Sequence, residues 1–281
     1  MSRKTNSTGG SWNSLRRWFT DSTAETANRK TKKETKKGAG DAKPLDSFEL
    51  DGVRFILDLR DGKDRGTSKD NEFVLVKPRS FIDFYRGLQN KEPKNILEVG
   101  MFEGGSLVLF DKLFSPGKLV GLDIRKEPIE PLENYRRERP HIETFYGLSQ
   151  NAPELRNILG EEFPEGIDLV VDDASHHYEM SRATFHSCFP LVNPGGLYVI
   201  EDWSWSHQPG AQTDAHPWFK RPALTNLILD LLINVPNSPH LEKVTLHQDI
   251  VVVEKSLTPP KTDIDLDRGH NRLRGRALGS L

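Results

Sequence analysis

Two acidic segments carry the residue types most able to do chemistry in this chain. The segment DLVVDDASHHYEM, residues 168–180, runs from an apolar stretch typical of a buried strand into two aspartates, a serine and two histidines, and YVIEDW at 198–203 ends in Glu201 and Asp202. Neighbouring parallel strands end at one sheet edge, where two acidic pairs repel unless a positive group lies between them. A hard divalent cation held by carboxylate oxygens meets this need. We therefore predict Asp173, Glu201 and Asp202 as Mg2+ ligands.

His176 follows Asp173 by three residues, where a turn would direct its imidazole back across the ion. Histidine is the side chain best matched to proton abstraction near neutral pH, and a metal ion lowers the pKa of a bound hydroxyl. The pattern predicts His176 as the general base that activates a hydroxyl nucleophile. Acidic strand ends also cap helices or face solvent, while His177 and Cys188 are expected to pack rather than react.

A glycine-containing loop, EVGMFEGGS from Glu98 to Ser106, follows the strand predicted at 95–100. Its glycines permit a tight turn and the close approach of a ligand. The loop lacks the GxGxxG pattern of dinucleotide-binding domains, and its carboxylates suit a cationic ligand better than a pyrophosphate. S-adenosylmethionine (SAM), which carries an amino group and a sulfonium, is such a ligand.

The predicted SAM site extends to the following strand ends. Asp123 ends the next strand and is placed to accept hydrogen bonds from two ribose hydroxyls, as also happens in NAD sites. Gln150 is a candidate for the adenine edge, and Asp172, which should point away from Asp173, is expected to cap the following helix or contact the cofactor. The full predicted cofactor set is Glu98, Gly100, Gly104, Ser106, Asp123, Gln150 and Asp172.

Short apolar segments alternate with helical patterns through the middle of the chain. Strands are predicted at 95–100, 118–123, 142–147, 167–172 and 196–202, and helices near 105–114, 129–137, 153–160 and 179–190. Pro222 opens a further helix that ends before Pro236, and 241–256 reads as two antiparallel strands. We expect an α/β fold: a mostly parallel, Rossmann-like sheet with helices on both faces and a C-terminal antiparallel hairpin, which resembles the class I methyltransferase fold.

The predicted domain organisation has four parts. Residues 1–45 form a disordered basic arm, 46–92 an entry segment with an edge hairpin or strand at 48–60 and a helix capped by Ser80, 93–255 the SAM-dependent methyltransferase domain, and 256–281 a disordered tail. The 281-residue chain has a net charge of −2, but the arm carries eleven Lys and Arg against four Asp and Glu. The rest of the chain is acidic and would repel phosphate groups, so we expect no binding of nucleic acid.

Partners and compartment are constrained less sharply. The arm's Trp12, Leu15 and Phe19 lie at helical spacing beside arginines, which suits a peripheral membrane or protein contact, although a solvated tail is the simpler reading. A homo-oligomer is left open. The single cysteine and the polar N-terminus make the cytoplasm the default expectation.

The motif at 173–176, Asp-Ala-Ser-His, and NPGGLYVIEDW at 193–203 resemble the macrocin and mycinamicin type of metal-dependent sugar O-methyltransferases and the related cephalosporin hydroxylase-like group. The resemblance covers roughly residues 93–255 and implies Mg2+ ligation by Asp173, Glu201 and Asp202, with His176 as the base. Ala174 replaces a glycine common in that family. The segment WSWSH at 203–207 departs from the family's substrate loop, which leaves the acceptor open.

The expected function is therefore SAM- and Mg2+-dependent O-methylation of a hydroxyl on a small molecule, such as a sugar or glycosylated metabolite. One alternative is a cephalosporin hydroxylase-like relative with another reaction, and another is a noncatalytic SAM-fold binding module. An RNA methyltransferase ranks lower because the body is acidic. The tryptophan-containing loop at 203–221 is expected either to close over the site or to pack on the body.

Overall fold

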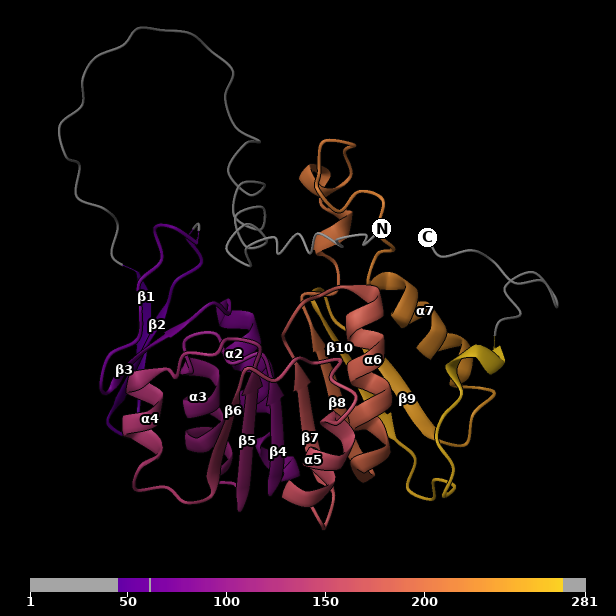
Figure 1. Ribbon diagram of the computed structural model, residues 1–281, viewed down its shortest axis with the longest axis horizontal. Helices are drawn as coiled ribbons and strands as arrows, with labels where there is room; N and C mark the ends of the chain where they lie inside the picture. Colours follow the sequence, from indigo (N-terminus) through magenta and orange to yellow (C-terminus); the bar gives the residue numbers. More distant parts are fainter. Residues whose placement is uncertain (1–44, 61, 270–281) are drawn as a thin grey trace, which may run out of the picture.

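The computed structural model describes residues 45–60 and 62–269 (Figure 1). The predicted disorder and contacts of the basic arm at 1–44, and the tail from 270 onward, lie outside the described residues. Within the described ranges, no helix has the length and apolar character needed to cross a bilayer.

A seven-stranded sheet with the order β6-β5-β4-β7-β8-β10-β9 forms the centre of the body. The first five strands in chain order are parallel, and β10 pairs antiparallel with both β8 and β9. The strands are β4 (Asn95–Val99), β5 (Lys118–Asp123), β6 (Ile142–Tyr146), β7 (Ile167–Asp172), β8 (Val192–Glu201), β9 (Leu241–Leu246) and β10 (Ile250–Lys255). The predicted parallel sheet and terminal hairpin are confirmed.

Helices cover both faces of this sheet because its apolar side chains alternate between two cores. One core contains side chains of α2, α3 and α4, and the other contains side chains of α5, α6 and α7. The helices are α2 (Arg79–Gly87), α3 (Gly105–Phe114), α4 (Glu130–Arg136), α5 (Leu155–Glu162), α6 (Tyr178–Cys188) and α7 (Thr225–Asn234). Short 3-10 turns lie at Gln89–Lys91, Phe189–Leu191, Trp205–His207, Pro209–Ala211 and Leu266–Gly269.

A separate three-stranded sheet precedes the large one. Strands β1 (Asp46–Leu50) and β2 (Val53–Leu57) form the predicted hairpin, and β3 (Glu72–Leu75), which the sequence pattern did not reveal, pairs parallel with β2. A Cβ at Gly105 would lie 2.3 Å from the carbonyl oxygen of Val74, so glycine permits β3 to approach the start of α3. This contact brings the segment after β3 to the edge of the large sheet.

Two boundaries differ from the prediction. Helix α2 begins at Arg79 with Pro78 at its N-cap and no side-chain cap, so the expected Ser80 cap is wrong. The chain after Ser256 packs onto the body, where Ile264 and Leu266 are buried in the core beside α7. These apolar side chains were too sparse to produce a periodic signal, and the ordered body therefore extends to residue 269 instead of ending at 255.

Candidate functional site

The strand order reverses at β4, whose neighbours β5 and β7 lie on opposite sides, and ligands of open α/β sheets bind at such a point. Here the loops after β4 and β7 touch through their backbones. The Asp173 amide donates to the Val99 carbonyl at 3.0 Å, and a Cβ at Gly100 would lie 2.4 Å from the Asp173 carbonyl oxygen. Gly100 also has a φ of 98°, which side chains rarely adopt. Glycine is therefore required for Asp173 to reach this edge.

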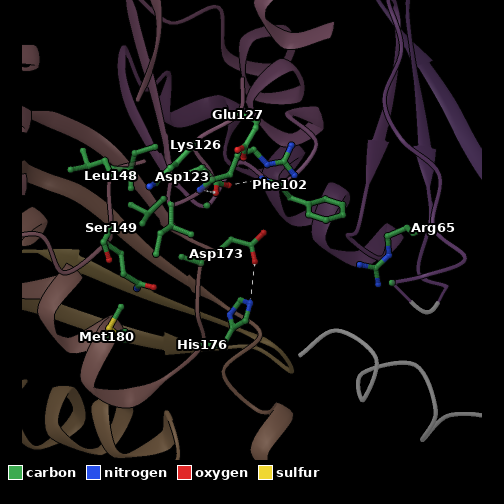
Figure 2. A pocket seen from close by; sticks show the side chains of 18 residues that line it. Arg65, Phe102, Asp123, Lys126, Glu127, Leu148, Ser149, Asp173, His176 and Met180 are labelled. Carbon is green, nitrogen blue, oxygen red and sulfur yellow. Dashed lines mark hydrogen bonds and ion pairs between the residues drawn. The ribbon is translucent and has the colours of Figure 1, made fainter. Parts of the chain in front are cut away.

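A cavity of about 430 Å3 opens at this edge, between the loops that follow β4, β5, β6 and β7 (Figure 2). Asp123 lies in its wall, where one carboxylate oxygen accepts hydrogen bonds from the amides of Met101 (3.0 Å) and Phe102 (3.1 Å), and the other accepts from the amide of Arg125 (2.8 Å). These bonds fix the carboxylate while lone pairs remain for further donors. Gln150 also lines the cavity and donates to the Thr184 hydroxyl at 2.8 Å.

The predicted cofactor residues separate into two sets. Gly100, Asp123 and Gln150 line the cavity, together with Asp173 and His176. Glu98, Gly104, Ser106 and Asp172 are not among its lining residues, and their contact with a cofactor stays a prediction.

Strand alternation explains the positions of Glu98 and Asp172. Glu98 is completely buried, and burial raises its pKa to about 8 although the Lys77 ammonium acts in the opposite direction. Asp172 points to the opposite face, where the Tyr198 hydroxyl donates to it at 3.1 Å and burial raises its pKa to about 7. Both carboxyl groups are buried in the interior of the fold.

Asp173, His176 and Asp202 come together beside the cavity, each offering one ligand atom within 4.8 Å of the others. The His176 Nε2 atom lies 3.6 Å from Asp173 Oδ1 and 3.9 Å from Asp202 Oδ2. Figure 2 shows the His176 ring directed at Asp173. His176 and Asp202 both have left-handed backbones, with φ of 54° and 52°, which turn their side chains back toward the group. The side chains that follow β7 and β8 therefore meet at one place, as predicted, for Asp173, His176 and Asp202.

The His176 ring nitrogens have distinct surroundings. Nδ1 lies 3.2 Å from the Glu201 carbonyl oxygen, so we assign its proton there, which leaves the Nε2 lone pair facing the two carboxylates. These three atoms together offer a ligand set to a positive ion. Two carboxylates are a sufficient protein donor set for Mg2+, which keeps several waters or substrate oxygens. The residues present therefore fit a divalent cation at Asp173 and Asp202, with His176 adjacent.

Glu201, the third predicted ligand, makes other contacts. One carboxylate oxygen accepts from the Lys77 ammonium and the other from the Tyr85 hydroxyl. Lys77 also donates to Asp173 Oδ2 at 2.7 Å. Glu201 lies two residues after Val199 in β8 and therefore points to the same face of the sheet, which carries α2. Asp202 follows the end of the strand, and its left-handed backbone turns its side chain away from that face. The structure thus brings Asp173 and Asp202 together and places Glu201 on Lys77.

Lys77 and Tyr85 are site residues that sequence reasoning missed. Burial lowers the pKa of Lys77, but the charges of Asp173 and Glu201 raise it well above its ordinary value, so the amine stays protonated. Burial raises the pKa of Glu201 to about 7, against the opposing effect of Lys77. The available signal was a lysine that ends the apolar run FVLV at 73–76 and precedes Pro78. A charged residue at the end of a buried strand needs a partner.

Two tryptophans of the loop after Asp202 contact the body beside His176 and His177. Trp205 is buried and its Nε1 donates to the His176 carbonyl at 2.9 Å. His177 meets the Trp218 ring edge-on at a centroid distance of 4.6 Å. Burial lowers the pKa of His177 to about 4, so it packs as a neutral ring, as predicted. Of the two readings of this loop, the structure shows the packed one, and Trp205 holds the backbone of His176.

A mostly parallel sheet that ends in an antiparallel hairpin, with a glycine turn and acidic strand ends around one cavity, defines the class I methyltransferase fold. Residues 97–203 match the family model described as a methyltransferase domain. Demethylmacrocin O-methyltransferase of Streptomyces fradiae is 36% identical over 140 residues, and mycinamicin VI 2''-O-methyltransferase of Micromonospora griseorubida is 33% identical over 140 residues. The predicted resemblance to the macrocin and mycinamicin type is confirmed.

These matches cover 47% of this chain and 33% of each relative, so the chain spans about a third of the length of the curated relatives that it matches. Among solved structures, the methyltransferase MycE of the mycinamycin pathway, in complex with Mg, SAH and mycinamycin VI, is 28% identical with a TM-score of 0.50. That comparison covers 63% of this chain and 49% of MycE.

Proposed function

We propose that this protein is a SAM-dependent, divalent-cation-dependent O-methyltransferase that acts on a hydroxyl of a small molecule. The observation that carries the proposal is the convergence of Asp173, His176 and Asp202 beside the cavity that Gly100 and Asp123 line. The three candidate ligand atoms and the cavity share one sheet edge, which supports a site where a divalent cation would lower the pKa of an acceptor hydroxyl close to a bound methyl donor.

The relatives support the narrower parts of the proposal. The solved relative is in complex with Mg, SAH and mycinamycin VI. The curated relatives are named for O-methylation of demethylmacrocin, mycinamicin VI and a rhamnosyl tetracenomycin. A sugar or glycosylated metabolite is accordingly the acceptor class that we propose here. The reading as a noncatalytic SAM-fold module becomes an outcome of the experiments below.

Each residue has a role that its position supports. We propose that Asp123 accepts hydrogen bonds from the ribose hydroxyls of SAM, that Gln150 contacts the adenine edge, and that Gly100, which lines the cavity, contacts the methionine portion. Asp173 and Asp202 would hold the divalent cation. When bound, that ion would lower the pKa of an acceptor hydroxyl.

The transfer itself requires one base and an in-line geometry. His176 Nε2 takes the proton of the acceptor hydroxyl, and the hydroxyl oxygen forms a bond to the methyl carbon while the carbon–sulfur bond breaks and its electron pair returns to sulfur. The products are a methyl ether, S-adenosylhomocysteine (SAH) and a protonated imidazole. The bond from His176 Nδ1 to the Glu201 carbonyl keeps Nε2 as the acceptor nitrogen for this role.

Calorimetry and a methyl-transfer assay on the full chain test the proposal. SAM should bind and NAD should not. Transfer to demethylmacrocin or mycinamicin VI as test acceptors should stop with EDTA and return with Mg2+. If SAM does not bind, the protein is not a SAM-dependent enzyme. If methyl transfer persists in EDTA, the reaction does not depend on a divalent cation.

His176→Ala tests the base. It should reduce turnover by about 100-fold or more while SAM affinity stays near wild type, because general bases contribute about 10²–10⁴-fold. The matched control is His186→Ala, which also replaces a histidine by alanine but lies on α6, outside the cavity lining. Mn2+ can replace Mg2+ in a binding titration. If His176→Ala also abolishes Mn2+ binding, the imidazole is a ligand of the cation instead of the base.

A further inference from the structure

Lys77 is a buried cation at the centre of the proposed cation site. Its side chain is 3% exposed, and its ammonium bridges Asp173 Oδ2, at 2.7 Å, and a Glu201 oxygen. The lysine comes from the connection between β3 and α2, outside the residues that match the methyltransferase family model. A segment before the large sheet therefore supplies a positive charge to its carboxyl edge.

This bridge divides the acidic residues into two groups. Asp173 uses one oxygen for Lys77 and the other faces His176, whereas both oxygens of Glu201 are held by Lys77 and Tyr85. Asp202 is a third exposed and turns toward His176 instead. A divalent ion at Asp173 and Asp202 would therefore share the Asp173 carboxylate with a like-charged ammonium, and repulsion between the two cations weakens binding of the ion.

We propose that Lys77 is a positioning residue that competes with the divalent cation for Asp173 and holds Glu201 away from it, so that the protein binds the ion weakly and exchangeably. This inference rests on the proposed function, because it concerns the same cation. The Tyr85 hydroxyl supports the arrangement by occupying the second oxygen of Glu201. Without the ammonium, both carboxylates become available to one ion.

Titration of the full-length protein with Mn2+ alone, followed by calorimetry or by the electron paramagnetic resonance of free Mn2+, tests the inference without any turnover. Lys77→Met removes the charge, and Lys77→Gln removes it while keeping an amide donor for the two carboxylates. Both variants should bind Mn2+ about tenfold or more tightly than the wild type, since a nearby unit charge shifts such equilibria by at least that factor. Lys77→Arg, which keeps the charge, should not tighten binding.

Lys118→Met is the matched control. Lys118 starts β5 at the opposite edge of the sheet, where it pairs with Glu162 at 2.6 Å, so the net charge changes equally but the proposed site does not. Its Mn2+ affinity should equal that of the wild type. Lys77→Met leaves two buried carboxylates without their ammonium and is the variant most at risk of unfolding, so circular dichroism accompanies each titration and Lys77→Gln provides the folded alternative.

The outcomes are distinct. Unchanged or weaker Mn2+ binding in folded Lys77→Met or Lys77→Gln overturns the inference, as does an absence of Mn2+ binding by every variant. Binding by the neutral variants but not by the wild type supports competition by the ammonium, but it contradicts the proposed cation dependence of the wild type. EDTA-resistant methyl transfer would instead contradict the proposed cation dependence, and it leaves the comparison of Mn2+ affinities unaffected.

Discussion

Gly100→Ala tests the backbone contact on which the site depends. Its new Cβ would lie 2.4 Å from the Asp173 carbonyl oxygen and 2.9 Å from the Ala174 Cα, and both contacts are to backbone that no rotamer change can relieve. Ordinary carbon–oxygen contacts are about 3.3 Å or longer, so the loop after β7 must move by about 1 Å. That movement displaces Asp173 from His176 and Asp202.

The cost has two parts. Forcing a residue with a Cβ to a φ of 98° costs about 1–2 kcal/mol, and an overpacked contact adds about 1–3 kcal/mol. We therefore expect a loss of about 3 kcal/mol in the free energy of unfolding, which lowers the Tm by about 6–12 °C for a body of this size. Methyl transfer should fall by about 100-fold, because a displacement of 1 Å has that effect on aligned groups.

Thermal unfolding measures the loss of stability, and the methyl-transfer assay measures the loss of activity. The matched control is Gly160→Ala in α5, where a Cβ meets no atom within 4 Å, and this variant should gain about 0.5–1 kcal/mol because alanine favours helices over glycine. A Gly100→Ala protein with the Tm and transfer rate of the wild type would refute the close approach of the two loops, and with it the placement of Asp173.

Three further predictions follow from single contacts. Trp205→Phe removes the donor to the His176 carbonyl but keeps a ring, so kcat should fall about tenfold with KM for SAM unchanged; an unchanged kcat would contradict the positioning role. Asp123→Asn replaces one carboxylate oxygen by an NH2 group that faces backbone amide donors, so the side chain loses its position. Calorimetry should then show SAM binding at least about tenfold weaker than in the wild type, and an unchanged SAM affinity would contradict the role of Asp123 in the cofactor site. Burial raises the pKa of Asp58, but bonds from Arg60 and from the Gly66 amide lower it to about 2, so its stabilisation is complete above pH 4 and lost as pH falls toward 2. The stability difference between wild type and Asp58→Asn, about 1 kcal/mol at pH 6 because Arg60 is half exposed, should shrink between pH 4 and pH 2 in urea titrations, and a difference independent of pH would contradict it.

The alternation of the chain was readable without coordinates because it is a local property. The apolar runs that became β4, β5, β6, β7 and β8 are each bounded by glycine or acidic residues, and the short link between β9 and β10 excludes a parallel return. Strand β3 was not predicted, since its four residues are too few to show a period and the connection from its parallel partner β2 spans residues 58–71. The burial of Ile264 and Leu266 was missed for the same reason, because two residues make no pattern.

The sequence by itself determined that Asp173 and Asp202 would meet at one edge, because parallel strands end together and each of these residues directly follows a strand. Only the tertiary structure decided which charges surround them. Lys77 lies 96 residues before Asp173, and no local pattern reports a contact across that separation. The buried ammonium is set by the packing of β3 and α2 against the sheet, and that packing turns Glu201 toward Lys77 and leaves Asp202 with His176.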